Sequence, residues 1–357
     1  MFRKILLLFA IILFSSFPTS LYSMEYLWEF SILYDGYLLQ PYNTPIIYNG
    51  SVTYSAGYGS IFYWDGIQTK TILDYGGGHQ SSFNGNIAWA MTDSNGEYNI
   101  YFWNGLDTVS ITQDNNLKGF PSVWENTIAW ETPYFYDSHI SDIYYFDGQN
   151  IRQITDTLGT LYSDVSSSLW DGQIAFTRWS PAGSGIMLWD GADLIEITPL
   201  MQKDRYPSLY NGTIAFSRGS GQDSHIMFWD GTTVSEIAQY TSYINGVPRV
   251  ALWENMIVWS GYDGQYAQIF LWDGTQVHQV TDNNAWHYYP DICIQDNQIQ
   301  IVYIESDYGP VSLLNRVIYA TAIIPEPSQI ILSMICIFLL FIKCNETISK
   351  QNLNIRR

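Results

Sequence analysis

The chain has 357 residues and a formal net charge of −19, because 34 acidic side chains outnumber 15 lysines and arginines. A surface this acidic offers no basic patch, so we expect neither nucleic acid nor an anionic membrane surface as a partner. Two of the three cysteines fall near the C-terminus and leave Cys293 alone in the body of the chain. The sequence therefore predicts neither a disulfide framework nor a cysteine-based metal site.

Residues 1–23 predict a secretory signal peptide. Arg3 and Lys4 supply the positive region, residues 5–14 the apolar region, and a stretch of small residues leads to an expected cut near Ser23. The apolar run is short for a bilayer span, which favours a cleaved signal over an anchor. We therefore expect an exported protein whose mature domain covers residues 24–324.

Two short phrases alternate along this mature domain. The first is a hydrophobic run that ends in Trp-Asp-Gly or a variant of it, with successive copies 39 to 43 residues apart. Its clear copies close at Gly66, Gly105, Gly148, Gly191, Gly231 and Gly274. The second is an Asn-Gly-like turn followed by a short apolar strand, as in residues 84–89 and 211–216. A period near 40 with strand-like units predicts a β-propeller, in which each repeat is one four-stranded blade.

The spacing of the two phrases predicts four strands, A to D, in each blade. The Asn-Gly phrase joins A to B and the Trp-Asp-Gly phrase joins C to D, because both dipeptides favour two-residue hairpin turns. Strand C is apolar at successive positions, as in residues 186–189, so both faces of its sheet must be covered. Stacking between two neighbouring blades meets that condition. We therefore interpret the tryptophans and Asp-Gly residues as blade core and turns.

Six complete repeats run from about Thr44 to Asp282, and residues 290–305 add a further A–B pair. Residues 315–323 predict a C strand, while residues 30–39 resemble a C–D hairpin. Joining the two ends would form a seventh blade and remove free sheet edges. The predicted fold class is thus an all-β propeller of seven blades, with six blades plus a terminal extension as the alternative.

Several stretches resemble the repeats of TolB-type, WD-like β-propellers. The resemblance is carried by residues 142–148, 153–156 and 207–216, and it extends loosely over most of residues 45–305. The family's first proline is matched by Pro121, Pro207, Pro248 and Pro290. The usual Ser-Pro-Asp-Gly turn of that family is replaced here, so the resemblance implies a fold and not a function. TolB-type propellers usually have six blades, which favours the alternative blade count.

Tight A–B and C–D turns should share one face of the ring, and longer B–C and D–A loops the other. We expect function on this second face or at the mouth of the central channel. Aromatic rings there suit stacking on sugars, with partial packing in the core as the alternative. The candidate binding residues are Tyr134, Tyr136, Trp179, Trp286 and Tyr288. No catalytic, cofactor or metal-binding motif is present, so we predict no cofactor and no metal.

The C-terminus carries a second export feature. Pro325, Glu326 and Pro327 precede an apolar run over residues 330–342 and a tail that ends in two arginines. Residues 325–357 resemble the PEP-CTERM sorting signal of Gram-negative bacteria that make exopolysaccharide. The resemblance implies a hydrophobic helix that anchors transiently in the inner membrane, cleavage by an exosortase-type protease, and delivery to the cell surface or the medium. An ordinary C-terminal membrane tail is the alternative.

These features favour a non-enzymatic, exported propeller that binds polysaccharide or a matrix protein. One alternative is a glycan lyase or hydrolase whose acidic pair has no recognisable motif. Two carboxylates about 5–10 Å apart in an aromatic cleft would favour that enzyme. A further alternative is a purely structural surface-layer or matrix component.

Overall fold

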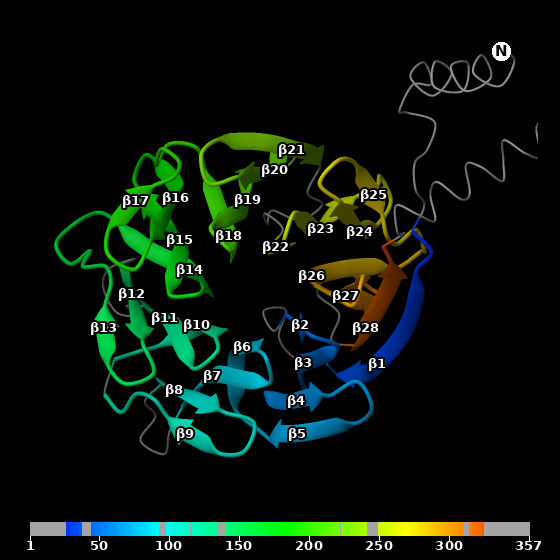
Figure 1. Cartoon of the computed structure of the whole chain (residues 1–357), viewed down its shortest axis with the longest axis horizontal. Helices are drawn as coiled ribbons and strands as arrows, with labels where there is room; N and C mark the ends of the chain where they lie inside the picture. The colour runs from blue at the N-terminus through cyan, green and yellow to red at the C-terminus, as the bar shows by residue number, and fades with distance from the viewer. Residues whose placement is uncertain are drawn as a thin grey trace, which may run out of the picture.

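The computed structural model describes residues 26–37, 44–92, 98–114, 116–133, 140–221, 223–240, 249–309 and 314–324. In these residues it shows seven four-stranded antiparallel sheets that stand around a ring, as Figure 1 shows. The seven-bladed propeller is thereby confirmed and the six-bladed alternative is wrong. The predicted signal peptide and sorting signal lie outside the described residues. Within the described part of the chain, no helix has the length and apolarity to cross a membrane.

Six blades are each formed by four consecutive strands. Blade 1 comprises β2 (Ile46–Tyr48), β3 (Ser51–Ala56), β4 (Ser60–Trp64) and β5 (Thr69–Leu73). Blade 2 comprises β6 (Gly77–Phe83), β7 (Asn86–Thr92), β8 (Tyr98–Trp103) and β9 (Thr108–Ser110). Blade 3 comprises β10 (Gly119–Trp124), β11 (Thr127–Pro133), β12 (Ser141–Phe146) and β13 (Ile151–Gln153).

The next three blades repeat this pattern, with strand A innermost. Blade 4 comprises β14 (Ser163–Trp170), β15 (Gln173–Ser180), β16 (Gly183–Trp189) and β17 (Leu194–Glu196). Blade 5 comprises β18 (Asp204–Tyr210), β19 (Thr213–Ser220), β20 (Asp223–Trp229) and β21 (Val234–Tyr240). Blade 6 comprises β22 (Val250–Trp253), β23 (Met256–Tyr262), β24 (Ala267–Trp272) and β25 (Val277–Gln279).

Blade 7 closes the ring with strands from both chain ends. Its sheet order is β26 (Trp286–Gln295), β27 (Gln298–Ser306), β28 (Leu314–Ile323) and β1 (Glu29–Tyr37). In Figure 1 the dark blue β1 lies along the orange β28 at the outer edge. The predicted closure is confirmed, but the C–D hairpin over residues 30–39 is wrong. Instead, β1 is one continuous outer strand, and β28 alone supplies strand C.

The two kinds of tight turn differ in construction. In the A–B turn of blade 1, Asn49 and Gly50 both have positive φ, 52° and 76°, as a two-residue hairpin requires. The C–D turns are longer than predicted: in blade 4, four residues separate Trp189 from Leu194. The Asp190 carboxylate accepts the main-chain N–H groups of Ala192 and Asp193 there, at 2.9 and 2.8 Å. Aspartate therefore recurs in this phrase because its side chain closes the turn, as Asx turns do.

The core lies between the blades, as the apolar strand C predicted. Large strand B side chains stack on the strand C residue directly across the sheet, with Trp130 and Tyr144 at 6.0 Å between ring centroids. Trp89 and Tyr101 form the equivalent pair in blade 2, at 6.1 Å. The predicted small strand B residues are fully buried, which allows close approach of the next blade. They are Ala88, Ala129, Ala175 and Ala215.

The Ile-Thr dipeptide that follows strand D fixes the course of the next loop. In blade 3 the Thr155 hydroxyl oxygen accepts the N–H of Ile143, which lies in strand C, at 3.0 Å. The same bond recurs in other blades. The equivalent threonines are Thr112, Thr198 and Thr281.

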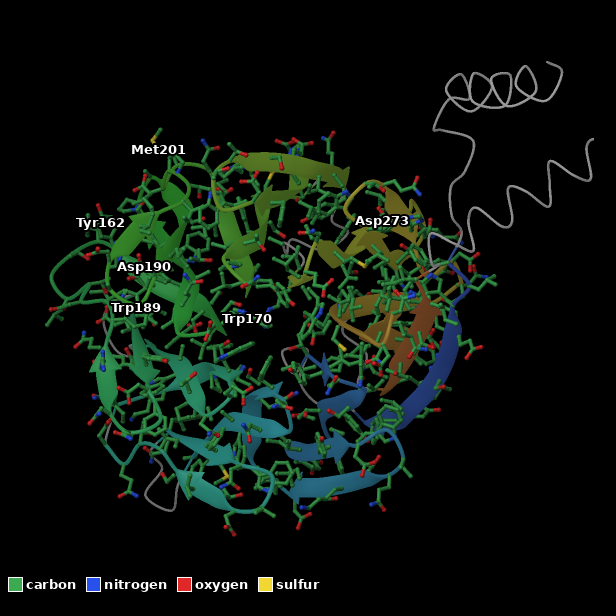
Figure 2. All side chains as sticks on the ribbon, viewed as in Figure 1. Tyr162, Trp170, Trp189, Asp190, Met201 and Asp273 are labelled. Carbon is green, nitrogen blue, oxygen red and sulfur yellow. The ribbon has the colours of Figure 1, made fainter. Side chains whose placement is uncertain are left out.

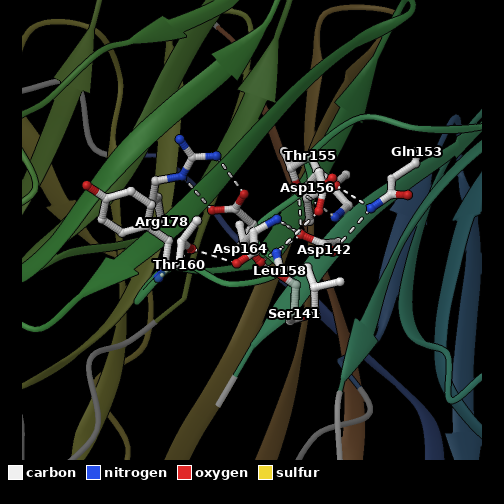
Figure 3. A network of polar contacts seen from close by, with 12 residues as sticks. Ser141, Asp142, Gln153, Thr155, Asp156, Leu158, Thr160, Asp164 and Arg178 are labelled. Carbon is white, nitrogen blue, oxygen red and sulfur yellow. Dashed lines mark hydrogen bonds and ion pairs between the residues drawn. The ribbon is translucent and has the colours of Figure 1, made fainter. Parts of the chain in front are cut away.

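Buried charges anchor this loop further (Figure 3). The Asp142 carboxylate accepts both the N–H and the hydroxyl of Thr157 at 2.8 Å. Beside it, Arg178 donates two hydrogen bonds to the fully buried Asp164, at 2.8 and 2.7 Å. The first network joins the D–A loop to strand C of blade 3, and the second joins strand A of blade 4 to its strand B. The D–A connections therefore reach the channel in fixed positions. The equivalent pair one blade on is Asp204–Arg218.

Candidate functional site

A central pocket of about 500 Å³ lies inside the ring of A strands. Its floor is formed by the residues that precede the A–B turns, including Tyr48, Phe83, Trp170 and Trp253. Its other lining residues come from the beginnings of the A strands, on the side of the D–A and B–C loops. We call that side the long-loop face and the opposite side the tight-turn face. The pocket therefore opens toward the long-loop face.

Six aromatic rings fill the channel at the tight-turn face, and we call them the aromatic plug. Neighbouring ring centroids are 3.8 to 5.5 Å apart around a closed circuit. The plug comprises Tyr48, Phe83, Trp124, Trp170, Tyr210 and Trp253. Trp170 also lies 5.7 Å from both Phe83 and Trp253 across the circuit, and Figure 2 shows it near the centre of the ring. The plug makes the pocket blind at this end.

Six pocket-lining residues occupy one repeat position, five residues before the first residue of the A–B turn in blades 1 to 6. We call them the pocket ring. In blade order they are Thr44, His79, Phe120, Ser166, Tyr206 and Arg249. In blade 7 the equivalent residue is Tyr289, two residues before Asp291, and it is not among the pocket-lining residues. Framework positions carry similar residues in most blades, yet the pocket ring carries six different residues. A scaffold that presents varied polar and aromatic side chains to one cavity suits a binding site.

Strand A is bulged at the pocket ring in blades 2 to 5, and at the equivalent Tyr289 in blade 7. His79, Phe120, Ser166 and Tyr206 have φ between 50° and 58°, a conformation that costs free energy for residues other than glycine. The strand A register shifts there in each blade. Bulges redirect side chains and occur often beside functional sites. Here they direct the chain toward the pocket.

Hydrogen bonds between blades fix the pocket wall just below the pocket ring. In four blades a strand A serine hydroxyl accepts a main-chain N–H of the next blade, as Ser122 does from Leu169 at 2.9 Å. The other three serines are Ser81, Ser168 and Ser208. Between blades 7 and 1 the Asp291 carboxylate takes this part and accepts the Ile47 N–H at 2.8 Å. The wall is thus preorganised before any ligand binds.

The ionisable groups of the pocket are shifted toward their neutral forms. Burial raises the pKa of Glu131 to about 8, against weaker opposing effects of the Ser166 N–H and Arg249. Burial likewise raises the pKa of Asp291 to about 7. Burial, and secondarily the charge of Arg249, lowers the pKa of His79 to about 4. At neutral pH the pocket therefore holds neutral His79, largely protonated Glu131, and the guanidinium of Arg249 as a permanent charge.

Arg249 is the one arginine or lysine among the described pocket-lining residues. Its guanidinium carbon lies 5.5 Å from the centroid of the Tyr206 ring, which favours a cation–π contact. It takes part in no ion pair within the described ranges. A cation held against an aromatic wall and lacking a described counter-ion is suited to an anionic group of a ligand.

The sequence-predicted site residues that the structure describes lie in strands, toward the long-loop face, and are not among the pocket-lining residues. Trp179 is in β15, where the guanidinium carbon of Arg205 stands 4.5 Å from its ring centroid. Trp286 and Tyr288 are both in β26, with ring centroids 6.4 Å apart, and Tyr262 stacks on Trp286. All four aromatic residues are partly buried. The prediction that Trp179 and Trp286 interrupt loops is wrong, although both lie toward the long-loop face.

Tyr134 and Tyr136 lie outside the described residues, as do Pro325, Glu326 and Pro327. The B–C connections also differ from the predicted long loops. In blade 4 only two residues, Pro181 and Ala182, separate β15 from β16. The structure therefore brings Trp286 and Tyr288 together and places Trp179 separately, in blade 4.

Sequence reasoning missed the pocket ring. The signal was present in blades 1 to 6 as a constant offset of five residues from the A–B turn. Three further aromatic side chains on long-loop connections were also missed and are 70% to 76% exposed. They are Tyr58, Tyr75 and Tyr308. In the described part of the chain, no group of three or more histidine, cysteine, aspartate or glutamate side chains is arranged to hold a metal ion.

No protein-family model and no curated protein matches the sequence. Among solved structures, the chain is similar to the β-propeller domain of the Trilobed protease from Pyrococcus furiosus. The TM-score is 0.59 at 11% identity, over 82% of this chain and 99% of that domain. That domain has an open velcro topology, whereas blade 7 here joins both chain ends.

Acylaminoacyl peptidase from Pyrococcus horikoshii is also similar, with a TM-score of 0.56 at 11% identity over 76% of this chain and 49% of that one. The chain thus spans about half of that peptidase. Solved neighbours include TolB-like β-propellers, such as TolB from Acinetobacter baumannii, at a TM-score of 0.44 and 14% identity. That match covers 81% of this chain and 63% of TolB. At these identities the likenesses show the fold alone.

Proposed function

We propose that this protein is an exported, non-enzymatic β-propeller that binds polysaccharide or another matrix component through its long-loop face. The observation that carries the proposal is the pocket ring, in which one repeat position presents six different side chains to one blind cavity. The partly buried Trp179, Trp286 and Tyr288 lie toward the same long-loop face, outside the pocket lining. Rings of this kind supply broad contact faces to sugars and lose little side-chain entropy on binding.

The positions of the chain ends agree with display from a surface. Strand β28 ends beside the A–B turn of blade 7, where the Ile324 N–H donates to the Asn297 carbonyl at 2.9 Å. Strand β1 begins beside it, with Glu29 opposite Thr321. Both ends therefore leave the propeller at the tight-turn face. A C-terminal anchor or sorting segment would be attached opposite the pocket mouth and leave the long-loop face free.

A glycan-cleaving enzyme would need a pair of available carboxyl groups. Glu131 and Asp291 both line the pocket, but each has an oxygen committed to a neighbouring blade. Glu131 accepts the Ser166 N–H at 2.5 Å, and Asp291 accepts the Ile47 N–H at 2.8 Å. Both carboxyl groups therefore serve to hold neighbouring blades together. The contacts therefore favour binding over cleavage.

Replacing Trp179 or Trp286 by alanine should weaken retention on the native polysaccharide by roughly 1–3 kcal/mol, the scale of an aromatic stack in a wet site. The expected loss is seen by affinity electrophoresis of the exported protein through gels that contain the polysaccharide. Leu106→Ala is the matched control, because Leu106 is 85% exposed on a C–D turn at the opposite face. If both tryptophan variants lose thermal stability but keep full retention, the two rings serve packing only.

Processing at Pro325-Glu326-Pro327 predicts a mature protein whose C-terminus lies close to that motif. Intact-mass spectrometry of the protein recovered from the cell surface or medium checks this directly. Recovery of a chain that still ends in Arg357 would contradict the exosortase proposal while leaving the binding face untouched.

A further inference from the structure

Resting on the proposed function, we infer that the central pocket receives the terminal residue of an acidic polysaccharide and that Arg249 binds the carboxylate of that sugar. The inference comes from three features of the pocket: its blind end, its single described cation, and the mixture of rings and hydroxyls around its mouth.

Because the pocket is closed at one end, it can admit only the terminal residue of a polymer. The aromatic plug closes the tight-turn end of the channel, so a polymer cannot pass through the ring. A cavity of about 500 Å³ is within the usual range for pockets that enclose small ligands. The accessible unit is therefore a terminal residue that enters from the long-loop face, and internal residues of the polymer remain outside.

The positive charge in the pocket favours a ligand that carries a carboxylate. Arg249 lies in the pocket ring without an ion-pair partner among the described residues, and a guanidinium binds a carboxylate with two parallel hydrogen bonds. Glu131 interacts electrostatically with Arg249, but its buried carboxyl group accepts the Ser166 N–H and has its pKa raised by burial to about 8, so it is largely protonated at neutral pH. Asp291 is held by the Ile47 N–H. The overall charge of −19 repels a long polyanion, which again favours recognition of a single terminal acid.

The remaining pocket-ring residues suit a sugar. Thr44 and Ser166 bring hydroxyl groups, which exchange hydrogen bonds with sugar hydroxyls. Phe120 and His79 bring rings in contact with each other, with centroids 3.9 Å apart. Tyr206 brings a third ring that also positions the guanidinium. Rings to stack on, hydroxyls to pair with and one guanidinium match a uronic acid better than an inorganic anion.

The test is isothermal titration of the full exported protein with trimers of galacturonate, glucuronate and mannuronate, each beside its methyl ester. We expect at least one acid trimer to bind with a Kd at least tenfold lower than its ester. Arg249→Gln should abolish that difference, and Arg249→Lys should keep part of it. The control is Arg152→Gln, which removes the same charge from an exposed arginine of β13 and should keep the whole difference.

Equal Kd values for acid and ester, or an unchanged difference in a folded Arg249→Gln variant, would overturn the inference. A hexamer that binds much more tightly than its trimer would overturn recognition of a terminal residue. Binding to neutral glycans alone overturns the acidic ligand and leaves the proposed function standing. Absence of binding to any glycan overturns both. Thermal melts of each variant establish that the proteins compared are folded.

Discussion

Replacing Glu131 by glutamine should make the protein more stable than the wild type at pH 9, with little difference at pH 4. Burial raises the pKa of Glu131 to about 8 from an ordinary 4.5. The folded state thus holds a proton that the unfolded state releases. The stability tied to that proton is fully present below pH 4.5 and is lost as pH rises through 8. Glutamine keeps an oxygen for the Ser166 N–H but does not ionise.

Urea unfolding of both proteins at pH 4, 7 and 9 measures this effect, which should be on the order of a few kcal/mol at pH 9. His79 contributes a slope of opposite sign between pH 4 and 6.5, because its pKa is lowered, but it is present in both proteins and cancels. Glu196→Gln is the matched control, since Glu196 is exposed on β17. Equal pH slopes for wild type and Glu131→Gln would show that Glu131 is already ionised in the folded protein.

Trp170→Ala should destabilise the protein by about 2–4 kcal/mol, in and below the lower part of the usual range for removing a core aromatic ring, because Trp170 is only partly buried. The Trp170 ring contacts Trp124 at 3.8 Å and Tyr210 at 4.1 Å, and it also meets two rings across the plug. Truncation would leave a hole in the pocket floor that its neighbours cannot fill. Chemical denaturation gives the change in unfolding free energy.

Trp170→Tyr is the matched control, because Tyr48 and Tyr210 occupy the equivalent position in other blades. We expect this variant to retain most of the stability. A Trp170→Ala protein as stable as the wild type would mean that the plug contributes little to closing the ring.

The blade architecture was predictable because its determinants repeat. Each A–B and C–D turn has a backbone or side-chain requirement that Asn-Gly or Asp-Gly meets, so the phrases recur with the blades. Blade 7 was harder to predict, because its strands C and D come from opposite ends of the chain and no C–D turn joins them. Residues 30–39 looked like a hairpin because Asp35-Gly36 imitates the turn phrase, yet both lie within the continuous β1. Pairing with β28 therefore overrode the local turn signal.

The pocket was less predictable for the opposite reason. A binding position on a repeat scaffold differs from blade to blade, so it forms no motif and leaves only a constant offset from the turn. The left-handed backbone at Phe120 and Tyr206 gives no signal in the sequence, because neither residue type favours it. Trp179 was taken for a loop residue because the B–C turn after it contains just Pro181 and Ala182.

The central claim is that the long-loop face binds glycan, and a glycan array probed with the folded protein tests it most directly. The account predicts retention on glycans that end in an acidic sugar, with loss of that signal in Arg249→Gln and no loss in Arg152→Gln. A folded protein that binds no glycan above background, or that binds equally well after both Trp286→Ala and Arg249→Gln, would contradict it.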